Sequence, residues 1–287
     1  HLFACWLRFQ APPVSCLTYV DDWQTITRDV DYTVRQLALV ERFAAMFDLT
    51  IDRRKTFGWA TCPDMRRCMR EQGIRVLHHA RELGGHMGIS KQYTNRTVAQ
   101  RIADLGEFWV QLRSSHAKYK AKVYMLRAVA WPRGLHAISS APIGDQTWLA
   151  LRRSAVKALG WQKPGVNPAV LLSLVESMVD PQFVAISWTF RTLRAQCPVD
   201  FWAVNVAPLA NGDLDLPPNA PASIALHRAQ AVGLQVERNG FVVDQFGPFC
   251  LQSCNIVEVD LRLQWAWKLV IAQKVSHRMD FHGLWQV

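Results

Sequence analysis

Two adjacent carboxylates, Asp21 and Asp22, stand between two β-prone runs near the start of the chain. The run from Val14 to Val20 is apolar, and the run from Thr25 to Thr27 is short, so the pattern predicts a strand, an acidic turn and a second strand. Neighbouring carboxylates repel each other, and a divalent cation between them removes that cost, because Mg²⁺ takes hard oxygen ligands. The alternative is a solvated turn, since Asp favours turns in any protein.

A second candidate lies beyond an amphipathic helix, which Asp29 or Asp31 would cap and which would end near Phe47. After it, the stretch 49–51 alternates like the start of a strand, and the stretch 56–60 reads as another strand. The basic turn between them contains Lys55. Without a further argument, Lys55 is an ordinary surface lysine.

A third candidate is the segment Leu83-Gly84-Gly85. Glycine has no side chain beyond hydrogen, so it lets one backbone approach another closely.

These three segments carry a resemblance. Tyr19-Val20-Asp21-Asp22 resembles the Tyr-X-Asp-Asp signature in the palm of reverse transcriptases. Lys55-Thr56 is similar to the lysine and threonine that follow the palm helix in that family, although Asp52 replaces the commoner asparagine. Leu83-Gly84 is similar to the hairpin that grips the primer. The likeness covers 1–90 well and 91–160 loosely, and it points to a non-LTR retrotransposon or a group II-like element.

The resemblance implies RNA-directed DNA synthesis from an RNA template, a DNA primer and deoxynucleoside triphosphates. Asp21, Asp22 and a third aspartate would hold two Mg²⁺ (or Mn²⁺) ions, one activating the primer hydroxyl and the other steadying the triphosphate. Lys55 would donate a proton to the departing pyrophosphate. Tyr19 and the glycines Gly84 and Gly85 would contact nucleic acid.

The resemblance also implies partners upstream. In this family the third aspartate, the rest of the palm and the fingers precede the Tyr-X-Asp-Asp strand, so we expect them before His1. We therefore expect the isolated chain to be a poor enzyme or an inactive one.

The positive charge is concentrated in one part of the chain. The net charge is +10, and residues 91–163 carry thirteen Lys and Arg against three Asp and Glu. Residues 1–90 have a net charge of +2, and residues 164–287 a net charge of −2. A polyanion is therefore expected to bind within 91–163.

Helical periodicity covers the same region. Apolar stripes predict helices over 95–116 and 118–130, and a third helix over 145–159. The predicted nucleic-acid contacts on these helices are Arg113, Lys118, Lys120, Lys122 and Arg127. Such a bundle after the palm resembles a polymerase thumb, and its charges would follow phosphates. The alternative is a solvated helix face.

The expected fold class is α+β. We expect a partial palm over 1–90 (β-hairpin, helix and antiparallel strands), a thumb-like all-α bundle over 91–163, and a mixed α/β region of unassigned role over 164–287. The rival hypothesis is a non-catalytic nucleic-acid-binding module or a domesticated retroelement remnant that uses 91–163.

Cysteine usage and hydropathy indicate the compartment. Seven unevenly spaced cysteines do not suggest a secreted disulfide framework. No run is long and apolar enough to span a bilayer, and no signal peptide is evident, so we expect an intracellular protein, nuclear or cytoplasmic, with no membrane partner. Cys250, Cys254, His277 and His282 have plausible zinc spacings within each pair, but the 22 residues between the pairs are too many for a finger, and we favour no zinc.

Overall fold

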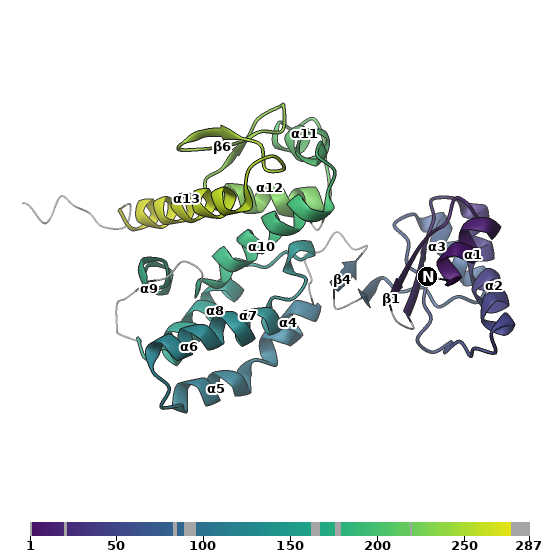
Figure 1. The fold of residues 1–287 in the computed structure, drawn as a ribbon, viewed down its shortest axis with the longest axis horizontal. Coiled ribbons are helices and arrows are strands. Elements are labelled where there is room, and N and C mark those ends of the chain that lie inside the picture. The colour runs from purple at the N-terminus through teal and green to yellow at the C-terminus, as the bar shows by residue number, and fades with distance from the viewer. Residues whose placement is uncertain are drawn as a thin grey trace, which may run out of the picture. The chain divides into compact units, whose positions relative to one another are not determined.

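The structure is a computed structural model that describes residues 2–19, 22–82, 85–88, 96–161, 167–175, 179–218 and 220–276. The chain divides into two compact units, which are described separately. The N-terminal unit comprises 1–80 and 87–90, and the C-terminal unit comprises 81–86 and 91–287. The chain is α+β and mostly helical, with small antiparallel sheets (Figure 1).

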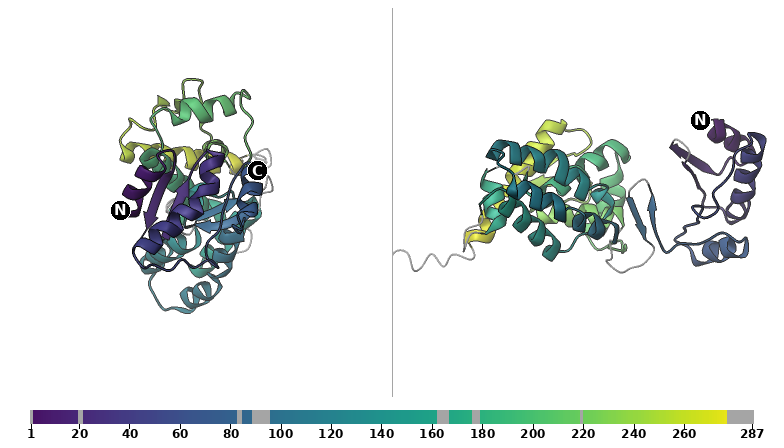
Figure 2. Two further views of the ribbon diagram at one scale, coloured as in Figure 1. Left: turned by 90° about the vertical axis from the view of Figure 1, so that its right-hand side faces the viewer. Right: turned by 90° about the horizontal axis from the view of Figure 1, so that it is seen from below.

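The N-terminal unit begins with helix α1 (Leu2–Gln10) and continues into the strands β1 (Ser15–Tyr19) and β2 (Asp22–Ile26). These strands pair antiparallel from Ser15↔Ile26 to Tyr19↔Asp22, so the predicted hairpin is present. Helices α2 (Val30–Met46) and α3 (Pro63–Glu71) follow. Figure 2 shows the β1–β2 hairpin beside α1 and α2.

An aromatic cluster holds this hairpin against the helices. Trp23 of β2 stacks on Phe3 of α1 with ring centroids 4.4 Å apart, and its edge meets Phe43 of α2 at 5.4 Å. Leu7, Ala11 and Val14 complete the buried core. Aromatic rings bury large apolar areas, so these three rings are a main part of this core.

Helix α2 starts where the sequence predicts. The Asp29 carboxylate accepts hydrogen bonds from the backbone N–H groups of Asp31 (2.8 Å) and Tyr32 (3.3 Å), and so caps the first turn. Arg53 and Glu41, and Arg67 and Asp64, form ion pairs on the surface of this unit.

The strands predicted over 49–51 and 56–60 are absent from the described residues, and that prediction is wrong. The chain instead makes a turn at Asp52, whose carbonyl oxygen accepts from the backbone N–H groups of Lys55 (3.1 Å) and Thr56 (3.0 Å). A parallel bridge between Gly58 and Val76 is the one β contact recorded for the 49–77 stretch of the described chain. A short hairpin, β3 (His79–Glu82) and β4 (Gly85–Gly88), lies where the two units divide.

The C-terminal unit contains two hydrophobic cores. Helices α4 (Arg96–Ala103), α5 (Gly106–Ser114), α6 (Tyr119–Met125), α7 (Trp131–Gly134) and α8 (Asp145–Ala158) surround the first core. A π-helical turn, Leu126–Ala130, joins α6 to α7, and a short 3₁₀ turn, Ile138–Ser140, precedes α8. Leu126, Trp131, Leu135 and Leu151 are among the most buried side chains of this core.

Two helices differ from the continuous helices that the sequence predicts over 95–116 and 118–130. The helix predicted over 95–116 breaks before Gly106, and Leu105 is fully buried there against Gly134, where a Cβ would come within 2.6 Å of its side chain. The helix predicted over 118–130 continues to Gly134 through the π-helical turn. Pro132 has no N–H to donate to the preceding turn, and the Trp131 N–H before it makes an i→i−5 bond to the Leu126 carbonyl oxygen.

The second core lies between helices α9 (Pro168–Val175), α10 (Pro181–Gln196), α12 (Pro221–Ala231) and α13 (Ile256–Ser276). A π-helical turn (Trp202–Val206), helix α11 (Ala207–Ala210) and the strands β5 (Gln235–Val236), β6 (Val242–Asp244) and β7 (Gly247–Phe249) cover one side.

Helix α10 connects the two cores. Val184 and Ala185 belong to the first core, and Phe183, Ile186 and Phe190 to the second, and Figure 1 shows α10 between the two groups of helices. The division predicted between 163 and 164 therefore lies within one compact unit.

None of the seven cysteines forms a disulfide. Among the described residues, no helix is long and apolar enough to cross a membrane.

Candidate functional site

The β1–β2 hairpin carries the first predicted site. Tyr19 ends β1, Asp22 begins β2, and the two residues pair. Asp21 lies outside the described residues, and only the backbone of Tyr19 and Asp22 is described. The next residue after Asp22 is Trp23, which the aromatic cluster fixes between α1 and α2. The acidic pair is therefore attached to a packed strand.

Helix α2 also supports the second predicted residue, Lys55. The Thr25 hydroxyl of β2 donates to the Gln36 amide oxygen of α2 at 2.9 Å, and Arg53 forms an ion pair with Glu41 of the same helix. One helix thus holds both the hairpin and the turn that contains Lys55. Lys55 itself is exposed.

The β3–β4 hairpin contains part of the third predicted site. Gly85 begins β4, and Gly84 lies outside the described residues. The predicted grip on nucleic acid at this hairpin stays a prediction.

The predicted cations of 91–163 fall into two groups. Lys118, Lys120, Arg113 and Arg127 are exposed, whereas Lys122 is half-buried. The Lys122 ammonium donates to the carbonyl oxygens of Arg113 (3.4 Å) and Ala158 (3.3 Å), in the final turns of α5 and α8. A cation at a helix C-terminus stabilises the helix dipole. Lys122 therefore holds three helices together.

Two arginines of the C-terminal unit are occupied in the interior. Arg152 of α8 forms a bidentate pair with Asp180 (2.7 and 3.1 Å) and also donates to Gln182 at 2.7 Å. Arg228 of α12 is buried and donates to the Thr189 hydroxyl and to the backbone carbonyls of Ile138, Ala141 and Ala185. These charges maintain the packing of the unit.

An open groove of about 570 Å³ lies between α4 and α7. Arg101, Arg133 and His136 line it together with a single acidic residue, Asp104. Arg101 donates to the His136 carbonyl at 2.8 Å, and Gln100 donates to the Asp104 carboxylate at 2.9 Å. Arg101 and Arg133 are not among the nucleic-acid contacts predicted from the sequence. Their convergence depends on the packing of α4 against α7, and no spacing in the sequence indicates it.

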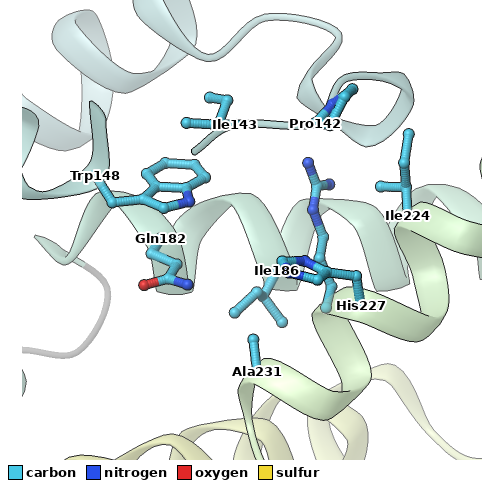
Figure 3. Close-up of a pocket in the computed structure, with 9 residues that line it drawn as sticks. Pro142, Ile143, Trp148, Gln182, Ile186, Ile224, His227 and Ala231 are labelled. Atoms are coloured by element: carbon cyan, nitrogen blue, oxygen red, sulfur yellow. The ribbon is translucent and has the colours of Figure 1, made fainter. Parts of the chain in front are cut away.

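A smaller cavity lies between α10, α12 and the segment before α8 (Figure 3). Trp148, Gln182 and His227 line it, and its free space is about 20 Å³. That volume holds about one water molecule, so the cavity does not fit a substrate.

The described residues contain no group of three or more His, Cys, Asp or Glu side chains arranged to hold a metal ion. Cys250 and Cys254 are half-buried, one helical turn apart, and His277 and His282 lie outside the described residues. A hydrogen bond with the Ser253 side chain lowers the pKa of the Cys250 thiol, while burial raises the pKa of the Cys254 thiol.

Comparison with protein-family models, with curated proteins and with solved structures gives no match for this chain.

Proposed function

We propose that this chain is part of an RNA-directed DNA polymerase, comprising the C-terminal part of a palm and a thumb-like helical region. The observation that carries the proposal is the β1–β2 hairpin, with Tyr19 and Asp22 paired at the end of its ladder. This is the setting that the Tyr-X-Asp-Asp resemblance requires.

The carboxylates of Asp21 and Asp22 are the type of ligand that Mg²⁺ and Mn²⁺ prefer, but two side chains are too few to complete a metal site. Adjacent carboxylates offer hard oxygen ligands, yet Mg²⁺ needs near-octahedral coordination, and two side chains supply only part of it. We propose that Asp21 and Asp22 hold the metal with a third aspartate from the upstream palm. When bound, the metal would activate the primer hydroxyl and neutralise charge on the triphosphate.

Lys55 would act beside these aspartates. It is exposed, on a turn tied to the helix that supports the hairpin. A lysine there balances the charge of a triphosphate and donates a proton to pyrophosphate as it leaves.

The exposed cations of the helical region would bind the primer–template backbone. Four of these exposed cations belong to α5, to the start of α6 and to the π-helical turn: Arg113, Lys118, Lys120 and Arg127. Arg133 contributes a further positive charge in the groove between α4 and α7. Phosphate contacts of this kind are independent of base sequence. They also support the second candidate, a nucleic-acid-binding module without catalysis.

Metal binding by the chain itself separates the two candidates. We expect weak Mn²⁺ binding, measured by electron paramagnetic resonance, that disappears in Asp21→Asn/Asp22→Asn and persists in Asp64→Asn, an exposed control on α3. The isolated chain should not extend a primer. Equal Mn²⁺ binding by the double variant and the wild type would favour the non-catalytic module.

A further inference from the structure

A single hydrogen-bonded turn joins strand β7 to helix α13, and it contains two cysteines. The Cys254 backbone N–H donates to the Cys250 carbonyl oxygen at 3.0 Å, which closes one turn of α-helical form. Strand β7 ends at Phe249 and helix α13 begins at Ile256, so the turn lies between the two elements and belongs to neither. Both cysteines are half-buried, and neither forms a disulfide.

The turn brings the two cysteines within the span of a disulfide. Residues four apart on an α-helical turn lie on the same face, and their Cα atoms are about 6 Å apart. Disulfides join Cα atoms that are about 4.4–6.8 Å apart, with Cβ atoms at about 3.5–4.5 Å. Because this turn lies outside α13, it can tighten to bring the Cβ atoms together without breaking that helix.

Cys62 and Cys68 are also close in sequence, but they lack this geometry. Cys62 stands at the N-terminal cap of α3, and Cys68 lies within the helix, six residues further on. Residues six apart on a helix lie on different faces. Both of these cysteines are half-buried, like Cys250 and Cys254, so the two pairs differ in arrangement at similar exposure.

The surroundings of Cys250 and Cys254 differ. The Ser253 side chain forms a hydrogen bond with the Cys250 thiol, and Arg194 of α10 donates to the next carbonyl oxygen of the turn at 2.6 Å. Both groups lower the pKa of the Cys250 thiol, whereas burial and the Glu258 carboxylate raise the pKa of the Cys254 thiol. An accessible thiol beside a positive charge and next to a second thiol is the arrangement typical of oxidant-sensing cysteines.

We propose that Cys250 and Cys254 form a peroxide-sensitive dithiol, in which hydrogen peroxide oxidises Cys250 and Cys254 then closes an intramolecular disulfide with it. This proposal does not rest on the proposed polymerase function.

The oxidation has two steps. The Cys250 thiolate attacks one oxygen of hydrogen peroxide, so an S–O bond forms, the O–O bond breaks, and the leaving hydroxide takes up the proton that Cys250 released. The Cys254 sulfur then attacks the sulfur of this sulfenic acid, so the S–S bond forms, the S–O bond breaks, and the leaving hydroxide takes up the proton of Cys254. Two thiols and one peroxide thus give one disulfide and two waters, and the two sulfurs supply the electrons that reduce the peroxide.

Peptide mapping of the full chain, treated with increasing amounts of hydrogen peroxide, tests the proposal. Residues 239–262 contain both cysteines and no Lys or Arg before Arg262, so one tryptic peptide reports on the pair. After thiols are blocked with N-ethylmaleimide, we expect this peptide to be unalkylated and two hydrogens lighter. Dithiothreitol before blocking should restore alkylation at both positions. Cys62 and Cys68 are the matched control and should need a higher dose to react.

Three substitutions test the order of the steps. In Cys254→Ser the reaction should stop at the sulfenic acid, which dimedone traps at Cys250. In Cys250→Ser dimedone should label Cys254 about tenfold less at the same dose, because less of that thiol is ionised. Ser253→Ala keeps both thiols but removes the hydrogen bond to Cys250, and should slow disulfide formation several-fold. Circular dichroism should show native helix content in all three variants.

Three results overturn the proposal. The first is a 239–262 peptide that stays alkylated at both positions at a dose that already oxidises Cys62 and Cys68. The second is oxidation of this peptide without an internal disulfide, either to sulfinic acid or to a disulfide between two chains that appears as a dimer on a non-reducing gel. The third is stronger dimedone labelling in Cys250→Ser than in Cys254→Ser, which would assign the first oxidation to Cys254.

Discussion

An ion pair at the surface of the N-terminal unit and an ion pair buried in the C-terminal unit have different consequences for stability. In the N-terminal unit, Arg53 pairs with Glu41 at the surface, where their side chains are 67 and 36% exposed. In the C-terminal unit, Arg152 and Asp180 are 11 and 0% exposed. Surface pairs contribute little to stability, whereas removal of one partner from a buried pair leaves an uncompensated charge.

This difference changes how the net charge should be interpreted. The excess of positive charge lies in 91–163. Within it, however, Lys122 donates to carbonyl oxygens at helix ends, and Arg152 pairs with the buried carboxylate of Asp180. The charge available to a polyanion is therefore smaller than the sequence count, and it is carried by exposed residues such as Lys118 and Lys120.

The largest expected effect is on the buried pair. Asp180→Ala removes the partner of Arg152 and also the cap of α10, where the carboxylate accepts from the Gln182 N–H (2.9 Å) and the Phe183 N–H (3.2 Å). We expect unfolding of the C-terminal unit to become easier by about 3–5 kcal/mol. The control Glu41→Ala should cost less than about 1 kcal/mol. Urea unfolding followed by circular dichroism measures both, and equal losses would contradict the comparison.

The N-terminal unit depends instead on its aromatic cluster. Trp23→Ala removes the ring between Phe3 and Phe43, and we expect a loss of about 2–3 kcal/mol, less than for a fully buried ring because Trp23 is half-buried.

Hydrogen exchange should locate this loss. Faster exchange is expected in α1, β1, β2 and α2, with the C-terminal unit unaffected. Trp265→Ala, at an exposed tryptophan of the other unit, is the control. Faster exchange throughout the chain would contradict the division into two units.

Charge reversal at exposed lysines tests whether these residues bind nucleic acid. Lys118→Glu/Lys120→Glu should weaken nucleic-acid binding for all sequences alike, and should lower the slope of log K against log salt by about 1.4–1.8. Both positions are exposed at the start of α6, where acidic residues suit the helix dipole, so folding should be retained. Arg238→Glu, exposed outside 91–163, is the control. An unchanged salt slope in the double variant would show that nucleic acid binds at another surface of the chain.

The smallest expected effect compares two thiols. Burial raises the pKa of Cys16 in the N-terminal unit, and the Ser253 hydrogen bond lowers that of Cys250 in the C-terminal unit. A lower pKa gives more thiolate at pH 8, so iodoacetamide should modify Cys250 several-fold faster than Cys16.

Mass spectrometry of the labelled peptides measures the two rates, and Ser253→Ala should slow only Cys250. The difference should shrink as the pH rises above both pKa values. Equal rates at pH 8 would contradict the assignment.

Local patterns were sufficient to predict the hairpin and the helix that supports it. The β-prone runs on both sides of Asp21-Asp22 and the cap at Asp29 are short-range signals, and both elements form. The second strand begins earlier than predicted, because Asp22 pairs with Tyr19 and belongs to β2 instead of the turn. The same signals failed over 49–60, where alternation predicted strands. There the Asp52 turn takes the backbone bonds, and no neighbouring strand is available in the described residues beyond the Gly58–Val76 bridge.

The remaining features depend on tertiary contacts. Leu105 packs on Gly134 where two helices meet, and Arg101 and Arg133 converge in one groove, although neither pair is adjacent in sequence. The roles of Lys122 and Arg152 likewise follow from which helix ends and carboxylates lie beside them. The composition gives the number of these cations, but it does not show which of them have structural roles and which are exposed.

Primer extension by a longer chain, with the palm and fingers that we propose to lie upstream, tests the central claim most directly. With an RNA template, a DNA primer, deoxynucleoside triphosphates and Mg²⁺, we expect synthesis by the wild type and none by Asp21→Asn or Asp22→Asn, with nucleic-acid binding retained in both variants. Synthesis that persists in either variant would show that these aspartates are not the metal ligands of a polymerase.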